Sequence, residues 1–406
     1  MKEKRLYNFL IFACAFLWIM MMGSKNVYTA EIVELQNIFN AGKSEIMLAM
    51  TYYFITYSSA QMILFFFMDD INVKWFMAIS IFLSGIVTVL VAFMTSLWQT
   101  WWLLALNGVL QAGVWGLCLA VLKKYLPNNM IPKANTIMNV GMTVASVISY
   151  GSAAISVAIK NWSLPFIVLG VILSISAIIF FIAVRFCEKN LPTRQDLPVK
   201  QTFDSEQILP IRSKRSKIIF FIISFIFSLF IHSVFYGTMN WMPNLLTENY
   251  GVKESIGILI SVFAPIATII GPIFAIKHCE KTPNFIKVCI IYLLVSTLLS
   301  LFLIFVFNSN IILATLILVI YIVFMQATVT IIFSVLPFKI GAGINTGALA
   351  SLMNAAGGYS AGLAPMILGK VIELNGWQTY FIIIFIITFL LFLGALPILK
   401  ITKKAK

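Results

Sequence analysis

The stretch YLPNNMIPKANTI (Tyr125–Ile137) decides the fold, because it recurs as VLPFKIGAGINTG (Val335–Gly347) in the second half of the chain. At a constant offset of 210 residues, the Leu-Pro and Asn-Thr pairs of the first stretch meet identical pairs in the second. Each stretch joins the fourth to the fifth long apolar run of its half. Matches at the same junction in both halves indicate an internal duplication.

The apolar runs around these stretches are long enough to cross a membrane. A bilayer core of about 30 Å needs roughly 20 apolar residues in a helix. Hydrophobic residues make up 61% of the 406 and charged residues 10%, whereas a soluble domain is about 25% charged. We therefore expect an all-α polytopic membrane protein with twelve transmembrane helices. The expected spans are Tyr7–Glu34, Glu45–Met68, Trp75–Thr95, Trp101–Leu122, Ala134–Ile159, Leu164–Val184, Ile218–Leu246, Ser255–Ile276, Asn284–Phe307, Ile311–Leu336, Ala342–Val371 and Trp377–Leu399.

The longest polar stretch divides these runs into two groups of six. We expect a six-helix bundle over residues 1–184, a cytoplasmic linker loop over 185–217 and a second six-helix bundle over 218–406. Two six-helix pseudo-repeats resemble the architecture of the major facilitator superfamily. That resemblance implies a substrate site near the bilayer midplane, between the halves.

The net charge is +14, and the placement of the basic residues along the chain indicates how the protein is oriented in the membrane. Most of the 28 basic residues lie in alternate loops between the expected spans, and Lys and Arg favour the cytoplasmic side of short loops. We therefore expect a multi-pass protein of the cell membrane with both termini in the cytoplasm. The expected partners are the lipid bilayer and a small-molecule substrate, with no nucleic acid, and the expected state is a monomer.

Lys25 stands inside the first apolar run, in WIMMMGSKNVYTA (Trp18–Ala30). An ionisable group within a span usually faces a cavity and is a functional hypothesis. Every acidic residue lies in a loop or within about two turns of an expected helix end. The simplest partner of the Lys25 ammonium is therefore an anionic substrate. The alternative is that Lys25 reaches the membrane surface or pairs with Glu31 or Glu34, and is structural.

Polar and aromatic side chains at helical spacing complete the candidate substrate site. Asn107, Gln111 and Trp115 follow one another at intervals of four in the fourth expected helix, and similar series occur in the second and seventh. Helix packing is an alternative role for the aromatic members. The expected substrate-binding residues are Lys25, Asn26, Tyr53, Tyr57, Gln61, Gln111, Trp115, His232, Tyr236, Asn240 and Trp241.

Two segments resemble those of organophosphate:phosphate antiporters. YGTMNWMPNLLTENYG (Tyr236–Gly251) is similar to that family's Tyr-Gly…Asp-Trp-x-Pro-x-Tyr-Leu segment, and Ser24-Lys25-Asn26 to its Arg-Lys-Asn. The family's paired phosphate-binding arginines fall at Ser24 and Phe235, so Lys25 alone matches a basic position. Arginine binds phosphate bidentately. A monoanion, such as a carboxylate or sugar acid, therefore suits this chain better than a doubly charged phosphate ester.

These observations predict a secondary transporter that moves a small organic anion (carboxylate, sugar acid or phosphate ester) across the cytoplasmic membrane by alternating access. The lack of a carboxylate in the middle of a span favours anion exchange, which needs no proton relay. The alternatives are a transporter or exporter of neutral or amphipathic compounds, with Lys25 structural, and a sensor on a transporter scaffold. The loops contain no catalytic triad, metal-ligand cluster or Walker-type loop, so we expect no enzyme, cofactor or metal.

Overall fold

The computed structural model describes most of the chain as helix, in two compact units. Unit 1 comprises Met1–Ala41, Leu48–Lys200 and Glu254–Val262, and unit 2 comprises Gly42–Met47, Gln201–Lys253 and Phe263–Lys406. Each unit is described by itself below. The residues described are 2–67, 72–127, 129–191, 214–282, 284–332, 336 and 346–403.

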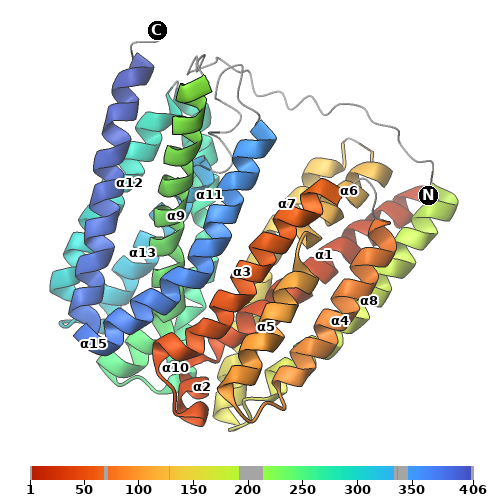
Figure 1. The fold of residues 1–406 in the computed structure, drawn as a ribbon, viewed down its shortest axis with the longest axis horizontal. Coiled ribbons are helices and arrows are strands. Elements are labelled where there is room, and N and C mark those ends of the chain that lie inside the picture. Colours follow the sequence, from red (N-terminus) through yellow and green to blue (C-terminus); the bar gives the residue numbers. More distant parts are fainter. Residues whose placement is uncertain are drawn as a thin grey trace. The chain divides into compact units, whose positions relative to one another are not determined.

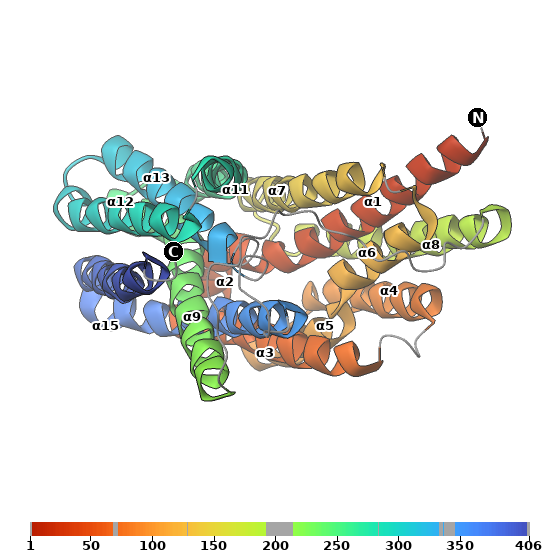
Figure 2. The ribbon, with the colours of Figure 1, turned by 90° about the horizontal axis from the view of Figure 1, so that it is seen from above.

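Unit 1 is built on a long first helix that packs against α7 and α8. The path of α1 beside α7 can be followed in Figure 2, and α4 packs along α8 on another side of the bundle. The first residues of α3 cluster with unit 2. The helices are α1 (Lys2–Ala30), α2 (Ile32–Phe39), α3 (Lys43–Phe67), α4 (Val73–Val91), α5 (Leu97–Gln111), α6 (Val114–Tyr125), α7 (Ile131–Ala158), α8 (Leu164–Asn190) and α10 (Glu254–Ser261).

Unit 2 centres on α9, which packs against α15 (Figure 1). A π-helical turn, Leu245–Asn249, continues α9, and α15 is two helices joined at Gly376, whose φ of 75° and ψ of 178° are not helical. Glycine adopts such a conformation at little cost. The helices are α9 (Lys214–Asn244), α11 (Phe263–Lys281), α12 (Phe285–Val306), α13 (Ile311–Thr330) and α15 (Thr346–Lys403).

The prediction of an all-helical polytopic fold with twelve spans is confirmed. Ten described segments are long and apolar enough to cross a membrane. One of them, Leu352–Pro397, contains the last two expected spans on either side of Gly376. The remaining expected span, Glu45–Met68, corresponds to α3, whose polar content keeps it below the apolarity of the other ten.

Three expected spans are each divided in the structure. The helix expected over Tyr7–Glu34 is interrupted at Glu31, between α1 and α2. The helix expected over Trp101–Leu122 ends at Gln111 and restarts at Val114, because Gly113 takes a left-handed φ of 78°. The helix expected over Ser255–Ile276 is interrupted at Val262, between α10 and α11.

Helices extend into both ends of the expected linker over 185–217. Helix α8 runs to Asn190 and α9 begins at Lys214, and the residues between 192 and 213 lie outside the described part. The first repeated stretch forms the connection from α6 to α7. The second, Val335–Gly347, lies outside the described residues apart from Leu336 and the start of α15.

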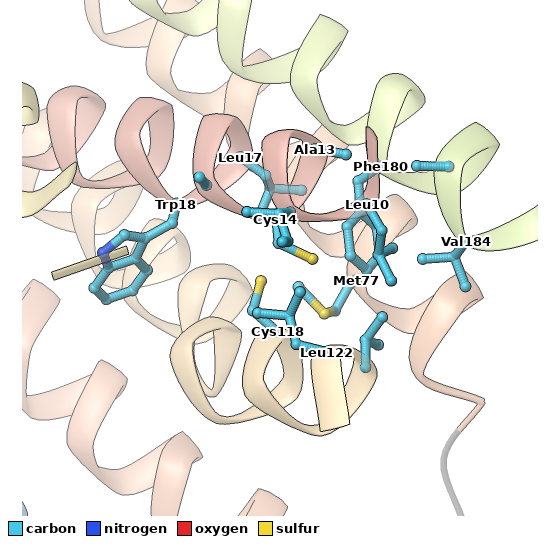
Figure 3. Packing of buried hydrophobic residues seen from close by; sticks show 14 of the residues in the cluster. Leu10, Ala13, Cys14, Leu17, Trp18, Met77, Cys118, Leu122, Phe180 and Val184 are labelled. Atoms are coloured by element: carbon cyan, nitrogen blue, oxygen red, sulfur yellow. The ribbon is translucent and has the colours of Figure 1, made fainter. Parts of the chain in front are cut away.

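The apolar core of unit 1 forms where α1 meets α4, α6 and α8. Figure 3 shows Cys14 of α1 facing Cys118 of α6, with Met77 of α4 and Phe180 of α8 closing around them. All four side chains are buried. Dispersion contacts between such closely packed side chains hold membrane helices together, because lipid offers no hydrophobic driving force between them. This core fixes α1 in its bundle and so positions the polar residues near the end of α1.

Helices α4 and α8 of unit 1 approach each other closely where they cross. A Cβ atom added at Gly85 would lie 2.6 Å from the Gly170 carbonyl oxygen and 2.8 Å from the Ser174 amide nitrogen. A Cβ atom added at Gly170 would lie 2.7 Å from the Gly85 carbonyl oxygen. The two backbones therefore touch, which is the packing that small residues permit between membrane helices.

Candidate functional site

Lys25 is half-buried on α1, five residues before that helix ends. Its Nζ atom lies 5.3 Å from the centroid of the Phe54 ring of α3, a distance at which a cation is attracted to an aromatic face. The preceding turn of α1 is held close to α7, because Ser149 Oγ donates a hydrogen bond of 2.9 Å to the Gly23 carbonyl. The lysine therefore projects from a firmly packed part of the helix.

A small cavity opens beside Lys25 within unit 1. The centre of a water molecule can occupy about 10 Å³ of it, which is room for roughly one ordered water. An organic substrate therefore needs this cavity to widen. The residues that line it are Ser24, Lys25, Tyr28, Met50, Tyr53, Thr88, Val91, Leu104, Asn107 and Phe166.

Gln111 of α5 forms hydrogen bonds to three other helices beside this cavity. It is fully buried, and its Oε1 atom accepts a hydrogen bond of 2.6 Å from the Tyr53 hydroxyl. Its Nε2 atom donates to Ser84 Oγ at 2.9 Å and to Ser24 Oγ at 3.3 Å. One amide thus connects α5 to α1, α3 and α4, immediately beside Lys25.

Asn107 extends the same network by one helical turn. Its Oδ1 atom accepts a hydrogen bond of 2.7 Å from Ser84 Oγ, and its Nδ2 atom donates to Thr88 Oγ1 at 3.1 Å. Thr88 donates in turn to the Ser84 carbonyl at 2.9 Å. A buried network whose members satisfy one another rigidifies its surroundings, so it holds the wall of the Lys25 cavity in one arrangement.

Gly108 brings α5 close enough to α3 for this network to form. A Cβ atom added there would lie 2.3 Å from the Tyr53 carbonyl oxygen and 3.0 Å from the Tyr57 amide nitrogen. Thr56 Oγ1 also donates to the Ala105 carbonyl at 2.7 Å across the same crossing. This backbone contact brings Tyr53 of α3 to the position from which its hydroxyl reaches Gln111.

The helix that carries Asn107 and Gln111 ends before Trp115, so the intervals of four do not run along one unbroken helix. The left-handed Gly113 turns the chain between them. Trp115 instead packs on Trp18 of α1, with ring centroids 4.8 Å apart.

The other predicted residues of unit 1 lie around the network. Asn26 Nδ2 donates to Ser146 Oγ of α7 at 3.1 Å. Tyr57 stacks on Tyr53 with ring centroids 5.8 Å apart, and Gln61 lies one turn further along α3, half-buried. The structure thus gathers Lys25, Tyr53, Tyr57 and Gln111, and turns Asn26 toward α7.

The four predicted residues of unit 2 lie along α9. His232 is buried, with Nδ1 at 2.7 Å from the Ser228 carbonyl oxygen, and its ring stacks on Tyr236 with centroids 6.0 Å apart. Asn240 is buried one turn on. Trp241 is buried against α15 and donates from Nε1 to the Pro365 carbonyl at 2.9 Å, a contact that serves packing within unit 2.

Residues 11–345 match the sequence model of the Major Facilitator Superfamily. The chain belongs to the Major Facilitator Superfamily. It is therefore a multi-pass membrane protein and a secondary transporter that works by alternating access on a small molecule, and it is not an enzyme. No curated protein matches it closely enough in sequence to count as a relative.

Solved structures of transporters share the superfamily fold with this chain. A bacterial homologue of the human lysosomal transporter Spinster, inward-facing and unoccupied, has a TM-score of 0.75 and 14% identity over 97% of this chain and 98% of that chain. A POT family transporter in complex with a thioalcohol-conjugated peptide gives 0.72 and 15%, over 98% and 96%. The nucleoside transporter NupG gives 0.65 and 18%, over 97% and 99%. Such low identities establish the fold alone.

Sequence reasoning missed the part that α4 plays in this superfamily member. Ser84 and Thr88 join Gln111 and Asn107 in one network, although neither was expected in the site. The available signal was the series Ser80, Ser84, Thr88, small polar residues at intervals of four in an otherwise apolar run. Hydroxyl residues in membrane helices commonly satisfy their own backbone, which makes such a series easy to pass over.

Sequence reasoning also missed the burial of Glu31. This residue lies at a helix end, as expected, but it is 0% exposed and contacts Ser156 of α7 through Oε1. It forms no ion pair with Lys25 among the described residues. Anion exchange was favoured because no carboxylate lies in the middle of a span, and that argument did not take account of a carboxyl group buried at a helix end.

Replacing Gln111 with leucine is expected to destabilise the protein. The change leaves the buried hydroxyl of Tyr53 without its acceptor and that of Ser84 without one donor, at a cost of about 1–3 kcal/mol for each unsatisfied group. Thermal unfolding of the detergent-purified Gln111→Leu variant should show a clear fall in Tm. The matched control is Gln326→Leu, at a half-buried glutamine of α13, which should change Tm much less. Equal shifts in the two variants would contradict the network's role.

Proposed function

We propose that this transporter carries a small organic anion, a carboxylate or sugar acid, and that Lys25 binds the anion's charge. The observation that carries the proposal is an ammonium beside a cavity with no acidic lining residue. Among the described residues, ion pairs engage other lysines: Lys43 with Glu248, Lys74 with Glu188 and Lys370 with Glu373.

Energetics favour a bound anion as the partner of Lys25. Withdrawing an ammonium from water costs several kcal/mol in a protein, whereas a cation–π contact such as that with Phe54 returns about 0.5–2 kcal/mol. The difference favours a second, negatively charged partner. An anion that enters the cavity supplies it, and the same deficit in the empty state helps to draw the anion in.

The chemistry around Lys25 favours a single negative charge. Ser24 stands where a second cation would be needed for a phosphate dianion, and its hydroxyl is already engaged with the Met21 carbonyl at 2.8 Å and with Gln111. One lysine balances one carboxylate. The hydroxyls and amides of the neighbouring network suit the polar groups of a hydroxylated acid.

A second candidate function is transport of a neutral or amphipathic compound. The observation that favours it is the aromatic lining of the cavity by Tyr28, Tyr53 and Phe166, together with the placement of Lys25 over Phe54. In that case Lys25 is a structural residue held by its cation–π contact.

Thermal unfolding of the detergent-purified protein with a panel of carboxylates, sugar acids, phosphate esters, neutral sugars and organic cations distinguishes the two. A ligand at a hundred times its Kd stabilises the folded state by about 2.7 kcal/mol. We expect stabilisation by a few monoanions in the wild type and in the control Lys287→Ala, an exposed lysine of α12, and none in Lys25→Ala. Stabilisation by neutral compounds or cations that persists in Lys25→Ala would contradict the proposal.

A further inference from the structure

Glu31 is a fully buried carboxyl group that the anion-binding site does not use. It lies between α1 and α2, and the residue before it, Ala30, belongs to an apolar cluster that α7 and α10 complete. From α10, Ile258 is fully buried in this cluster, with Val262 packed against it. Glu31 therefore follows directly on an apolar cluster to which α10 contributes, and its carboxyl contacts Ser156 on the same helix, α7, as most of that cluster. The other members of the cluster are Tyr150, Ala153, Ala154 and Val157.

The hydrogen bonds around Glu31 fit a neutral carboxylic acid. Ser156 Oγ contacts both Glu31 Oε1 and, at 2.7 Å, the Ala153 carbonyl oxygen. A hydroxyl has one hydrogen to donate. Ser156 therefore shares its one hydrogen between the Glu31 carboxyl and the Ala153 carbonyl, and it gives an ionised Glu31 only part of the hydrogen bonding that a carboxylate needs.

The second carboxyl oxygen supports the same protonation state. Glu31 Oε2 is buried and has no hydrogen-bond partner among the described residues. An ionised carboxylate would place negative charge on this unsolvated oxygen, whereas the carbonyl oxygen of a neutral acid carries far less. Burying an unpaired charge is among the costliest events in a protein, and a carboxyl group avoids it by keeping its proton.

The charged neighbours of Glu31 add repulsion. Glu34 on α2 interacts unfavourably with it, and Glu254 at the start of α10 faces Glu34 and accepts a hydrogen bond of 3.0 Å from Asn37 Nδ2. Burial raises the pKa of Glu31 to about 8, and burial followed by the charge of Glu254 raises that of Glu34.

No described basic residue on the same elements offsets the repulsion among these carboxyl groups by an ion pair with Glu31. Lys25 lies on α1, Lys160 follows α7 and Lys253 precedes α10, and none of them forms an ion pair with Glu31 within the described part of the chain. The remaining titratable group of the apolar cluster is Tyr150 of α7, which is itself buried.

We propose that Glu31 is a proton-binding site of the transporter, filled in the conformation described here and emptied when α10 leaves α7. On emptying, the O–H bond of the carboxyl group breaks, the proton passes to water and a carboxylate remains. Removal of Ile258 and Val262 would admit that water. The carboxylate, once formed, repels Glu34, which itself interacts unfavourably with Glu254 at the start of α10, so proton binding and α10 packing favour each other.

This site gives the transporter a means of coupling to a proton gradient. If the substrate is a monoanion, which rests on the proposed function, one proton and one anion crossing together move no net charge. The proton site itself does not depend on the identity of the substrate, and its tests use none.

The first test is infrared spectroscopy of the purified protein across pH 5 to 10. We expect a protonated-carboxyl absorption at pH 7 that disappears as the pH rises through about 8, that is absent in Glu31→Gln and that persists in the control Glu34→Gln. Absence of the absorption in the wild type at pH 7, or its persistence in Glu31→Gln, would overturn the proposal.

The same group should give stability a pH dependence of known sign. Between the ordinary glutamate pKa of 4.5 and about 8, the folded protein holds a proton that the unfolded chain has released. Stability therefore falls as the pH rises through this window. The fall in Tm should be smaller in Glu31→Gln than in the wild type. An identical pH profile in the two proteins would contradict a buried, protonated Glu31.

The second test measures the packing of α10 on α7 directly. Spin labels are attached at Ile155→Cys and Leu259→Cys, two exposed positions on α7 and α10, and the five native cysteines are buried. We expect one short distance at pH 6, a longer population at pH 9, and a distance independent of pH when Glu31→Gln is added. No change with pH in the wild-type background, or the same change in Glu31→Gln, would show that the proton and α10 are not linked.

Discussion

Lys25→Ala is expected to lower kcat/KM for uptake of the anionic substrate by about 30-fold or more. Removing one partner of a desolvated charge pair costs about 2–5 kcal/mol, and each 1.36 kcal/mol is a factor of ten in rate. The measurement is uptake into proteoliposomes of the monoanion identified by thermal unfolding. Lys25→Arg, which keeps the charge, should retain more activity than Lys25→Ala.

The control for this prediction is Lys287→Ala, which removes a lysine from an exposed position on α12. Its uptake should equal that of the wild type, since a change in overall charge alone does not alter the site. Uptake by Lys25→Ala within a few-fold of the wild type would show that the lysine is structural and would favour a neutral or amphipathic substrate.

Gly85→Ala is expected to lower the yield of folded protein severely. The added methyl group would lie 2.6 Å from the Gly170 carbonyl oxygen and 2.8 Å from the Ser174 amide nitrogen, so α4 and α8 would have to separate. Overpacking costs about 1–3 kcal/mol when side chains can adjust, and backbone atoms adjust less. Size-exclusion profiles and thermal unfolding of the purified variant measure the effect.

Gly151→Ala is the matched control, because a Cβ atom at that helical position meets nothing within 4 Å. Alanine is favoured over glycine inside a helix by about 0.5–1 kcal/mol, so this variant should be as stable as the wild type or slightly more so. Equal unfolding temperatures for Gly85→Ala and Gly151→Ala would mean that the α4–α8 crossing is not tightly packed.

The positions of the membrane-spanning helices could be predicted from sequence, because a membrane span needs only length and apolar content. The break at Gly113 could not, since it lies inside an expected span and depends on one backbone angle. The division of α15 at Gly376, by contrast, falls between two expected spans. Glycine also occurs within unbroken membrane helices, as at Gly108 of α5, so its presence alone does not mark a break. Gln111 and Trp115 lie on different helices because of the left-handed angle at Gly113.

The centre of the candidate site was predictable because a lysine in an apolar run is conspicuous. Gln111 and Tyr53 followed from helical spacing, and their side chains do meet, 58 positions apart in sequence. Glu31 was not predictable as a buried group. Its cover comes from α7 and α10, and its contact with Ser156 spans 125 positions, so its environment exists only once the helices have packed.

The two proposals give Lys25 and Glu31 different tasks in one transport cycle. In the proposed mechanism, Lys25 offers a fixed positive charge to a substrate, and Glu31 offers a carboxyl group whose charge changes with its surroundings. They lie six residues apart, Lys25 on α1 and Glu31 between α1 and α2, yet the described residues show no ion pair between them. The two charges are thus available for separate tasks, which is what coupled movement of an anion and a proton requires.

The most direct test of the central claim is an experimental structure of the protein with the stabilising monoanion bound. We predict a carboxylate oxygen within about 4 Å of Lys25 Nζ, the distance of an ion pair, with the cavity beside Tyr53 and Asn107 widened to hold the rest of the molecule. A ligand bound elsewhere, with Lys25 Nζ still over the Phe54 ring and unpaired, would contradict the account.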